Sequence, residues 1–112
     1  MDFEVFAAPP KYKRDQAAKA DAGKPMMELI PTSAYKSLGA VLTYGAQKYA
    51  PNSWQKVDRD RYIGALIRHF VAYLDDPTGV DEESGLRHSQ HLLCNAMFLD
   101  NFAEREISHV EN

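Results

Sequence analysis

The chain has 112 residues, a formal net charge of −3 and one cysteine. This length fits one domain with a modest core, and the acidic balance gives no electrostatic reason to expect binding to duplex nucleic acid. A lone cysteine excludes an internal disulfide, and no apolar run is long enough to span a bilayer or to resemble a signal peptide. We therefore expect a soluble cytoplasmic protein.

The first 23 residues predict an N-terminal arm ahead of a single helical domain at 24–112. The arm is polar and rich in alanine, and Pro9 and Pro10 interrupt it. Its apolar side chains Phe3 and Phe6 would dock on another subunit. The run KPMMELIP at 24–31 follows, and its two prolines favour an extended segment or a single turn over a long helix.

The first helix is predicted for the run that follows Thr32 or Ser33, either of which is a good N-cap. Apolar residues recur at helical spacing from 34 to 45, and Pro51 ends the pattern. A loop with the only tryptophan, Trp54, comes next.

A second helix is predicted from Asp58 or Asp60 to about Leu74. Apolar residues occur nearly all round it, which is typical of a central helix buried on most sides. Two polar side chains interrupt this pattern, Arg68 and His69. A buried guanidinium needs a partner, so this pair is a candidate functional feature.

The last helix is predicted after an acidic loop, with Ser84 as its N-cap candidate. His88, His91 and Asn95 fall on one stripe of this helix at i, i+3 and i+7. The whole pattern predicts an all-α protein, a small bundle of three main helices with an extended N-terminal arm. Two long apolar helices leave faces that so short a chain can barely cover, so we expect a homo-oligomer to complete the bundle.

The histidines and loop acids can form a metal site. His88 and His91 can ligate one ion from one helix face, with Glu83 or Asp81 and perhaps the opposite His69 completing the shell. The alternative is a set of histidines that are simply hydrogen-bonded inside a bundle. The metal set is therefore Asp81, Glu83, His88 and His91, and the candidate catalytic residues are His69, Glu83 and His88.

Basic and aromatic side chains can form a nucleotide pocket, since Arg and Lys bind phosphate and aromatic rings stack on bases. Each of them has an ordinary structural explanation as well: Lys48 can be solvated, Trp54 can plug the end of the bundle, and Arg68 can pair with a nearby acid. The candidate ligand-binding residues are Lys24, Tyr44, Lys48, Tyr49, Asn52, Trp54, Arg68, His69 and Asn95.

The order of the motifs resembles a family of small phage domains described as dATP/dGTP diphosphohydrolase, N-terminal-like. The resemblance covers residues 24 to about 100 and rests on four segments of this sequence, namely KPMMELIP, VLTYGAQKYAPNSW, YIGALIRHFVAYL and DEESGLRHSQHLLCNAMFL. It implies a phage protein, working in the host cytoplasm, that handles purine deoxynucleotides. It also implies a distant relation to the all-α MazG-like pyrophosphohydrolases, which are oligomers that use Mg²⁺ or Mn²⁺.

One departure weakens the implied hydrolysis. MazG-like enzymes bind their metals through ExxE and ExxD pairs, and this sequence has no ExxE and no ExxD on its central helices. Three functions therefore stay open: a nucleoside triphosphate pyrophosphohydrolase, a non-catalytic sponge that sequesters a nucleotide-derived immune signal of the cyclic-nucleotide or ADP-ribose type, and a purely structural helical protein.

Overall fold

The computed structural model describes residues 22–111. Three helices make up its body: α1 (Thr32–Lys48), α2 (Arg59–Asp75) and α3 (His88–Glu111). Short 3₁₀ turns, η3 (Met27–Leu29) and η4 (Ser53–Lys56), precede α1 and α2. The described residues contain no strand beyond an isolated antiparallel bridge between Val80 and Arg87, so the all-α prediction is confirmed. Of the arm predicted for 1–23, residues 1–21 lie outside the described residues.

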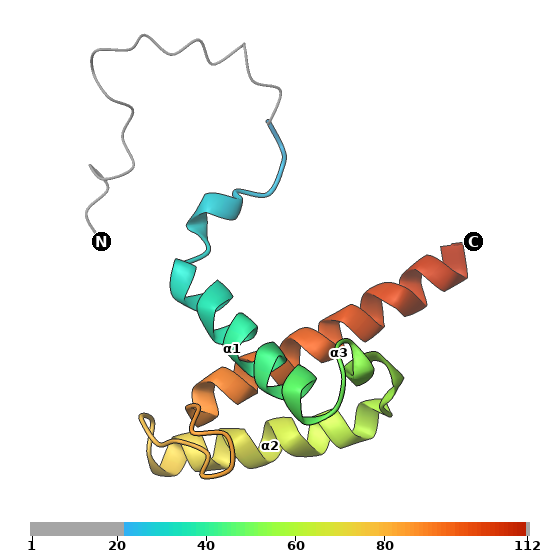
Figure 1. Ribbon diagram of the computed structural model, residues 1–112. Coiled ribbons are helices and arrows are strands. Elements are labelled where there is room, and N and C mark those ends of the chain that lie inside the picture. Colours follow the sequence, from blue (N-terminus) through green and yellow to red (C-terminus); the bar gives the residue numbers. More distant parts are fainter. Residues whose placement is uncertain (1–21, 112) are drawn as a thin grey trace, which may run out of the picture.

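The longest helix, α3, organises the bundle because both other helices pack against it. In Figure 1, α1 crosses α3 on one side, while α2 runs beneath it and diverges from its C-terminal half. The segment with η3 stands off from the three helices at the start of α1. None of the helices among the described residues is both long and apolar enough to cross a membrane.

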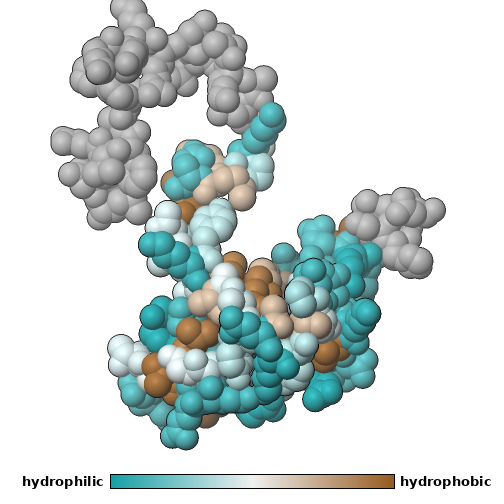
Figure 2. Space-filling model, in the orientation of Figure 1, coloured by the Kyte–Doolittle hydropathy of each residue, from teal (hydrophilic) through white to brown (hydrophobic). Residues whose placement is uncertain are grey.

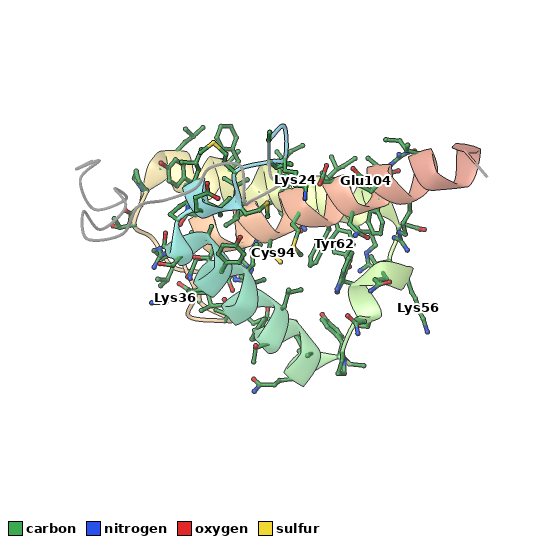
Figure 3. The ribbon with its side chains drawn as sticks, turned by 90° about the horizontal axis from the view of Figure 1, so that it is seen from above. Lys24, Lys36, Lys56, Tyr62, Cys94 and Glu104 are labelled. Carbon is green, nitrogen blue, oxygen red and sulfur yellow. The ribbon has the colours of Figure 1, made fainter. Side chains whose placement is uncertain are left out.

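The core lies along one face of α3. Its buried apolar side chains are Val41 from α1 and Cys94, Phe98 and Phe102 from α3. Trp54 stacks on Phe98 with ring centroids 4.6 Å apart, and Tyr62 donates its hydroxyl to the Trp54 carbonyl at 2.9 Å. Figure 3 shows Tyr62 and Cys94 near the middle of the bundle, whereas Lys36 and Lys56 extend outward. The prediction that Trp54 plugs an end of the bundle is consistent with this stack.

Cys94 is the most deeply enclosed residue of this core, with an exposed fraction of 0%. Burial disfavours the thiolate and raises the pKa of the thiol to about 12. A thiol that stays protonated and has no access to solvent is a poor nucleophile. Cys94 therefore acts as a small apolar core residue, as its place in an apolar helix predicted.

The prediction that the second helix is buried on most sides is wrong for the described chain. No residue of α2 is buried, and Ile67, Phe70 and Leu74 are 53%, 45% and 62% exposed. The helix rests on α3 with one face only, because α1 packs against α3 and leaves the rest of α2 uncovered. Figure 2 shows apolar surface over the end of the molecule where α2 finishes.

The predicted N-cap Ser84 lies four residues before α3 begins at His88, so that prediction is wrong. The intervening chain forms a tight turn instead, in which Asp81 N–H donates to the Leu86 carbonyl and Gly85 N–H donates to the Asp81 carbonyl, both at 2.7 Å. Gly85 takes a φ of +74°, which favours glycine. Because Ser84 lies in this turn and does not cap α3, its hydroxyl is available to another partner.

Candidate functional site

The three histidines predicted as metal or catalytic residues meet at one end of the bundle, where the end of α2 faces the start of α3. His69 and His88 approach each other most closely, with their Nδ1 atoms 2.9 Å apart. The ring of His69 also stacks on that of His91, with centroids 4.6 Å apart and planes 10° from parallel. Helical spacing places His88 and His91 one turn apart on α3, so both face α2.

Asp81 completes this group. His69, Asp81 and His88 each offer one ligand atom, and these atoms lie within 4.8 Å of one another. All three side chains are half-buried. This set, which we call the His-Asp cluster, is the candidate metal site. It draws on both helices and the loop between them, so its geometry depends on how α2 packs against α3.

Ser84 fixes His91 beside the cluster. Its Oγ lies 2.7 Å from His91 Nε2 and accepts a hydrogen bond from Leu86 N–H at 3.1 Å, so the hydroxyl proton is free to point to the imidazole. Asn95 donates its side-chain amide to the His91 carbonyl at 2.8 Å. His91 and Asn95 are the buried polar residues of this group, and both have hydrogen-bond partners within the protein.

The electrostatics favour the neutral forms of His69 and His91. Burial, followed by the neighbouring His91 and His88, lowers the pKa of His69. Burial likewise lowers the pKa of His91. For Asp81, burial raises the pKa, but hydrogen bonds from Ser84 and the nearby imidazoles outweigh it and leave the pKa below its ordinary value. Neutral imidazoles and an ionised carboxylate are the forms in which these groups bind metal.

Glu83, which the sequence predicted as a ligand, turns to a different partner. Its carboxylate forms an ion pair with Lys48 at the end of α1. This pairing raises the pKa of Lys48, and together with Tyr44 it lowers the pKa of Glu83. The ring of Tyr44 also meets His91 edge to face, with centroids 6.4 Å apart. Lys48, Glu83 and Tyr44 therefore form a polar layer that links α1 to the loop beside the His-Asp cluster.

An open hollow of about 690 Å³ lies over this end of the molecule. Its lining runs along the loop and reaches the cluster at Asp81 and His88, and it includes Val80, Glu82 and Glu83. Two ligands of the cluster and the partner of Lys48 thus face the same solvent-filled space. A ligand in the hollow could contact the metal ligands and this polar layer together.

Other predicted ligand-binding residues are not brought to the hollow. Trp54 belongs to the core, and Asn95 is committed to the His91 carbonyl. Arg68 is exposed and lies back along α2 over Gly64. Lys24 is exposed and precedes η3 in the chain. Asn52 is an exposed loop residue with a φ of 62°.

Tyr49, another predicted ligand-binding residue, lies close to Lys48. It follows α1 directly, is 72% exposed, and its ring lies 5.1 Å from Lys48 Nζ. Ser84 was missed as a site residue because its place before an apolar helix is typical of an N-cap. The sequence offered one signal, the seven-residue separation between Ser84 and His91. The two side chains come into contact because the chain turns at Gly85.

A second hollow, of about 1040 Å³, lies at the opposite end of α2, between residues 55–61 and the side chains of Phe102, Arg105 and Glu106. Arg59 pairs with Glu106 across it at 3.3 Å. The charges that line it are of both signs and exposed, and it brings together no set of metal ligands among the described residues. The His-Asp cluster is therefore the stronger candidate site.

Comparison with known proteins agrees with the motif pattern. A family model described as dATP/dGTP diphosphohydrolase, N-terminal, matches residues 14–110. A dATP/dGTP diphosphohydrolase of Salmonella phage PMBT28 is 35% identical over 81 residues, which are 72% of this chain and 28% of that protein. The chain thus spans less than a third of the length of this relative. No solved structure matches the chain.

Proposed function

This chain belongs to the dATP/dGTP diphosphohydrolase N-terminal family, as its motifs predicted, and we propose that it acts on purine deoxynucleoside triphosphates as a metal-dependent diphosphohydrolase. The observation that carries the proposal is the His-Asp cluster opening, beside Lys48 and Glu83, on one hollow. A metal ion and a cationic side chain both stabilise the negative charge of a triphosphate. The cluster offers ligands for the ion, and Lys48 offers the cationic side chain.

The reaction we propose adds water to the α-phosphorus, breaks its bond to the oxygen that bridges to the β-phosphorus, and releases diphosphate and a deoxynucleoside monophosphate. His69, Asp81 and His88 would hold the divalent ion, which supplies charge neutralisation and a more acidic water. Lys48 would leave Glu83 for a phosphate oxygen, since phosphate carries more charge than one carboxylate.

Glu83 then gains a role in the same step. Once Lys48 turns to the phosphate, the carboxylate of Glu83 loses its partner and can accept the proton of the attacking water. Tyr44 lies beside the same carboxylate and contributes to lowering its pKa. The exposed ring of Tyr49, next to Lys48, is the aromatic surface best placed to stack on a purine. Trp54 has no such role because it is part of the core.

A product assay tests this function. The full chain is incubated with each deoxy- and ribonucleoside triphosphate in Mg²⁺ or Mn²⁺, and monophosphate and diphosphate are separated by ion-exchange chromatography. We expect dATP or dGTP to be cleaved, and Lys48→Met to lose most of the activity. Lys36→Met removes an exposed lysine of the same helix that extends outward (Figure 3) and is not among the residues that line the hollow, so it is the matched control. If the chain binds a nucleotide but cleaves none of them under all of these conditions, the proposed enzymatic activity is excluded.

The alternative function is a sponge that holds a nucleotide-derived immune signal intact. The missing ExxE and ExxD pairs favour it, because the hollow then offers fewer carboxylates than a MazG-like hydrolase uses. Incubation with cyclic nucleotides or ADP-ribose derivatives, followed by heat denaturation, separates the two. Intact ligand in the supernatant supports the sponge, and degraded ligand rules it out.

Self-association is also part of the proposal. Five apolar side chains on one face of α2 are exposed at spacings of three to four residues, and we call them the α2 stripe: Ile63, Ile67, Phe70, Val71 and Leu74. A contiguous apolar face of this kind marks an interaction surface. Sedimentation equilibrium should show a dimer or larger species that Ile67→Asp dissociates and Lys56→Asp does not. A wild-type chain that sediments as a monomer at all concentrations would refute it.

A further inference from the structure

The donor set of the His-Asp cluster is informative about the ion itself. Two of its three ligands are imidazoles and one is a carboxylate. Mg²⁺ prefers oxygen ligands and binds imidazole poorly, whereas first-row transition ions accept mixed nitrogen and oxygen ligands. We propose that the site takes a first-row transition ion such as Mn²⁺ through His69, Asp81 and His88, and that Mg²⁺ does not fill it. This inference rests on the proposed function only for its biological use.

The two imidazoles of the cluster already converge on one point. The His69 and His88 Nδ1 atoms lie 2.9 Å apart, the distance of a hydrogen bond between the two rings. One ion bound between these nitrogens would take the place of the proton that the rings share.

Asp81 is held in position to supply a third ligand. Its backbone N–H donates to the Leu86 carbonyl, and its Oδ2 accepts a hydrogen bond from Ser84 N–H at 2.9 Å. The second carboxylate oxygen is left for the ion. All three ligand atoms lie within 4.8 Å of one another.

The two other predicted ligands have different partners. Glu83 pairs with Lys48, and His91 directs its Nε2 to Ser84. The stacked ring of His91 fixes the plane of His69 instead, which makes His91 a positioning residue rather than a ligand. The hollow over Asp81 and His88 leaves the remaining coordination positions open to water or to phosphate oxygens.

Mn²⁺ binding to the full chain tests the inference directly. Free Mn²⁺ gives a sharp six-line electron paramagnetic resonance signal that is lost on binding, and pulsed measurements detect nitrogen bound to the ion. We expect one Mn²⁺ per chain with coupled nitrogen, retained in a hundredfold excess of Mg²⁺. Asp81→Asn, which keeps an acceptor for Ser84 N–H, should weaken binding at least about tenfold. Glu82→Gln neutralises a neighbouring acid and should change the affinity less than about threefold.

Absence of coupled nitrogen, displacement by Mg²⁺, or loss of binding on Glu83→Gln but not on Asp81→Asn would each overturn the proposal. None of these results depends on nucleotide cleavage, so failure of the metal site and failure of the proposed hydrolysis are separately visible.

Discussion

Removal of the Ser84 hydroxyl should loosen the whole loop that carries Asp81. In Ser84→Ala, Leu86 N–H loses its acceptor and His91 Nε2 loses the partner at 2.7 Å. The His91 side chain is buried, at 8% exposure, so water does not readily replace that bond. Two lost bonds, one of them to a buried group, cost about 2–3 kcal/mol of unfolding free energy. For a domain of this size that lowers Tm by about 10–20 °C.

Thermal unfolding followed by far-ultraviolet circular dichroism measures this effect. The matched control is Ser53→Ala, which removes a hydroxyl that bonds only to the Ala50 carbonyl, at 2.9 Å in a half-exposed turn. That loss should cost less than about 1 kcal/mol. If Ser84→Ala and Ser53→Ala unfold at the same temperature, Ser84 is not the residue that fixes His91, and the account of the loop is wrong.

Three further predictions concern stability. Because the pKa values of His69 and His91 lie below 6.5 in the folded chain, the unfolded chain takes up protons first as the pH falls; Tm should therefore drop between pH 7 and pH 5 in metal-free protein, and a flat profile would contradict the shifts. Phe98→Ala should cost about 3–5 kcal/mol by urea denaturation, since it empties the centre of the aromatic core. Gly85→Ala should lower the free energy of unfolding by about 1–2 kcal/mol because of its φ of +74°. Gly39→Ala, in a helix with open space beside it, should raise the free energy of unfolding by about 0.5–1 kcal/mol. If both substitutions change the stability in the same direction, the reasoning is wrong.

The sequence by itself determined the helical framework. Apolar spacing predicted one helix that follows Thr32 or Ser33 and ends before Pro51, and a second from Asp58 or Asp60 to about Leu74. The structure has α1 and α2 at Thr32–Lys48 and Arg59–Asp75. Local spacing is sufficient here because helix hydrogen bonds join residues four apart and prolines block them at defined positions. The motif order likewise predicted the family, because the motifs lie within the matched residues 14–110.

The roles of residues within the candidate site depend on contacts between distant parts of the chain, which the sequence does not specify. Lys48 and Glu83 are 35 residues apart, and nothing in their sequence positions predicted that they would pair. His69 and His88 come within 2.9 Å only because α2 crosses α3 at that point. Each of these residues has several possible partners in the sequence, and packing selects one.

Burial of α2 shows the same limit. An all-round apolar pattern predicted a helix enclosed on most sides, yet its stripe from Ile63 to Leu74 is exposed in the described chain. A sequence states which side chains favour burial, since that depends on their own transfer free energy. Which neighbour covers them is decided by the tertiary arrangement, and here α3 covers one face while α1 lies elsewhere.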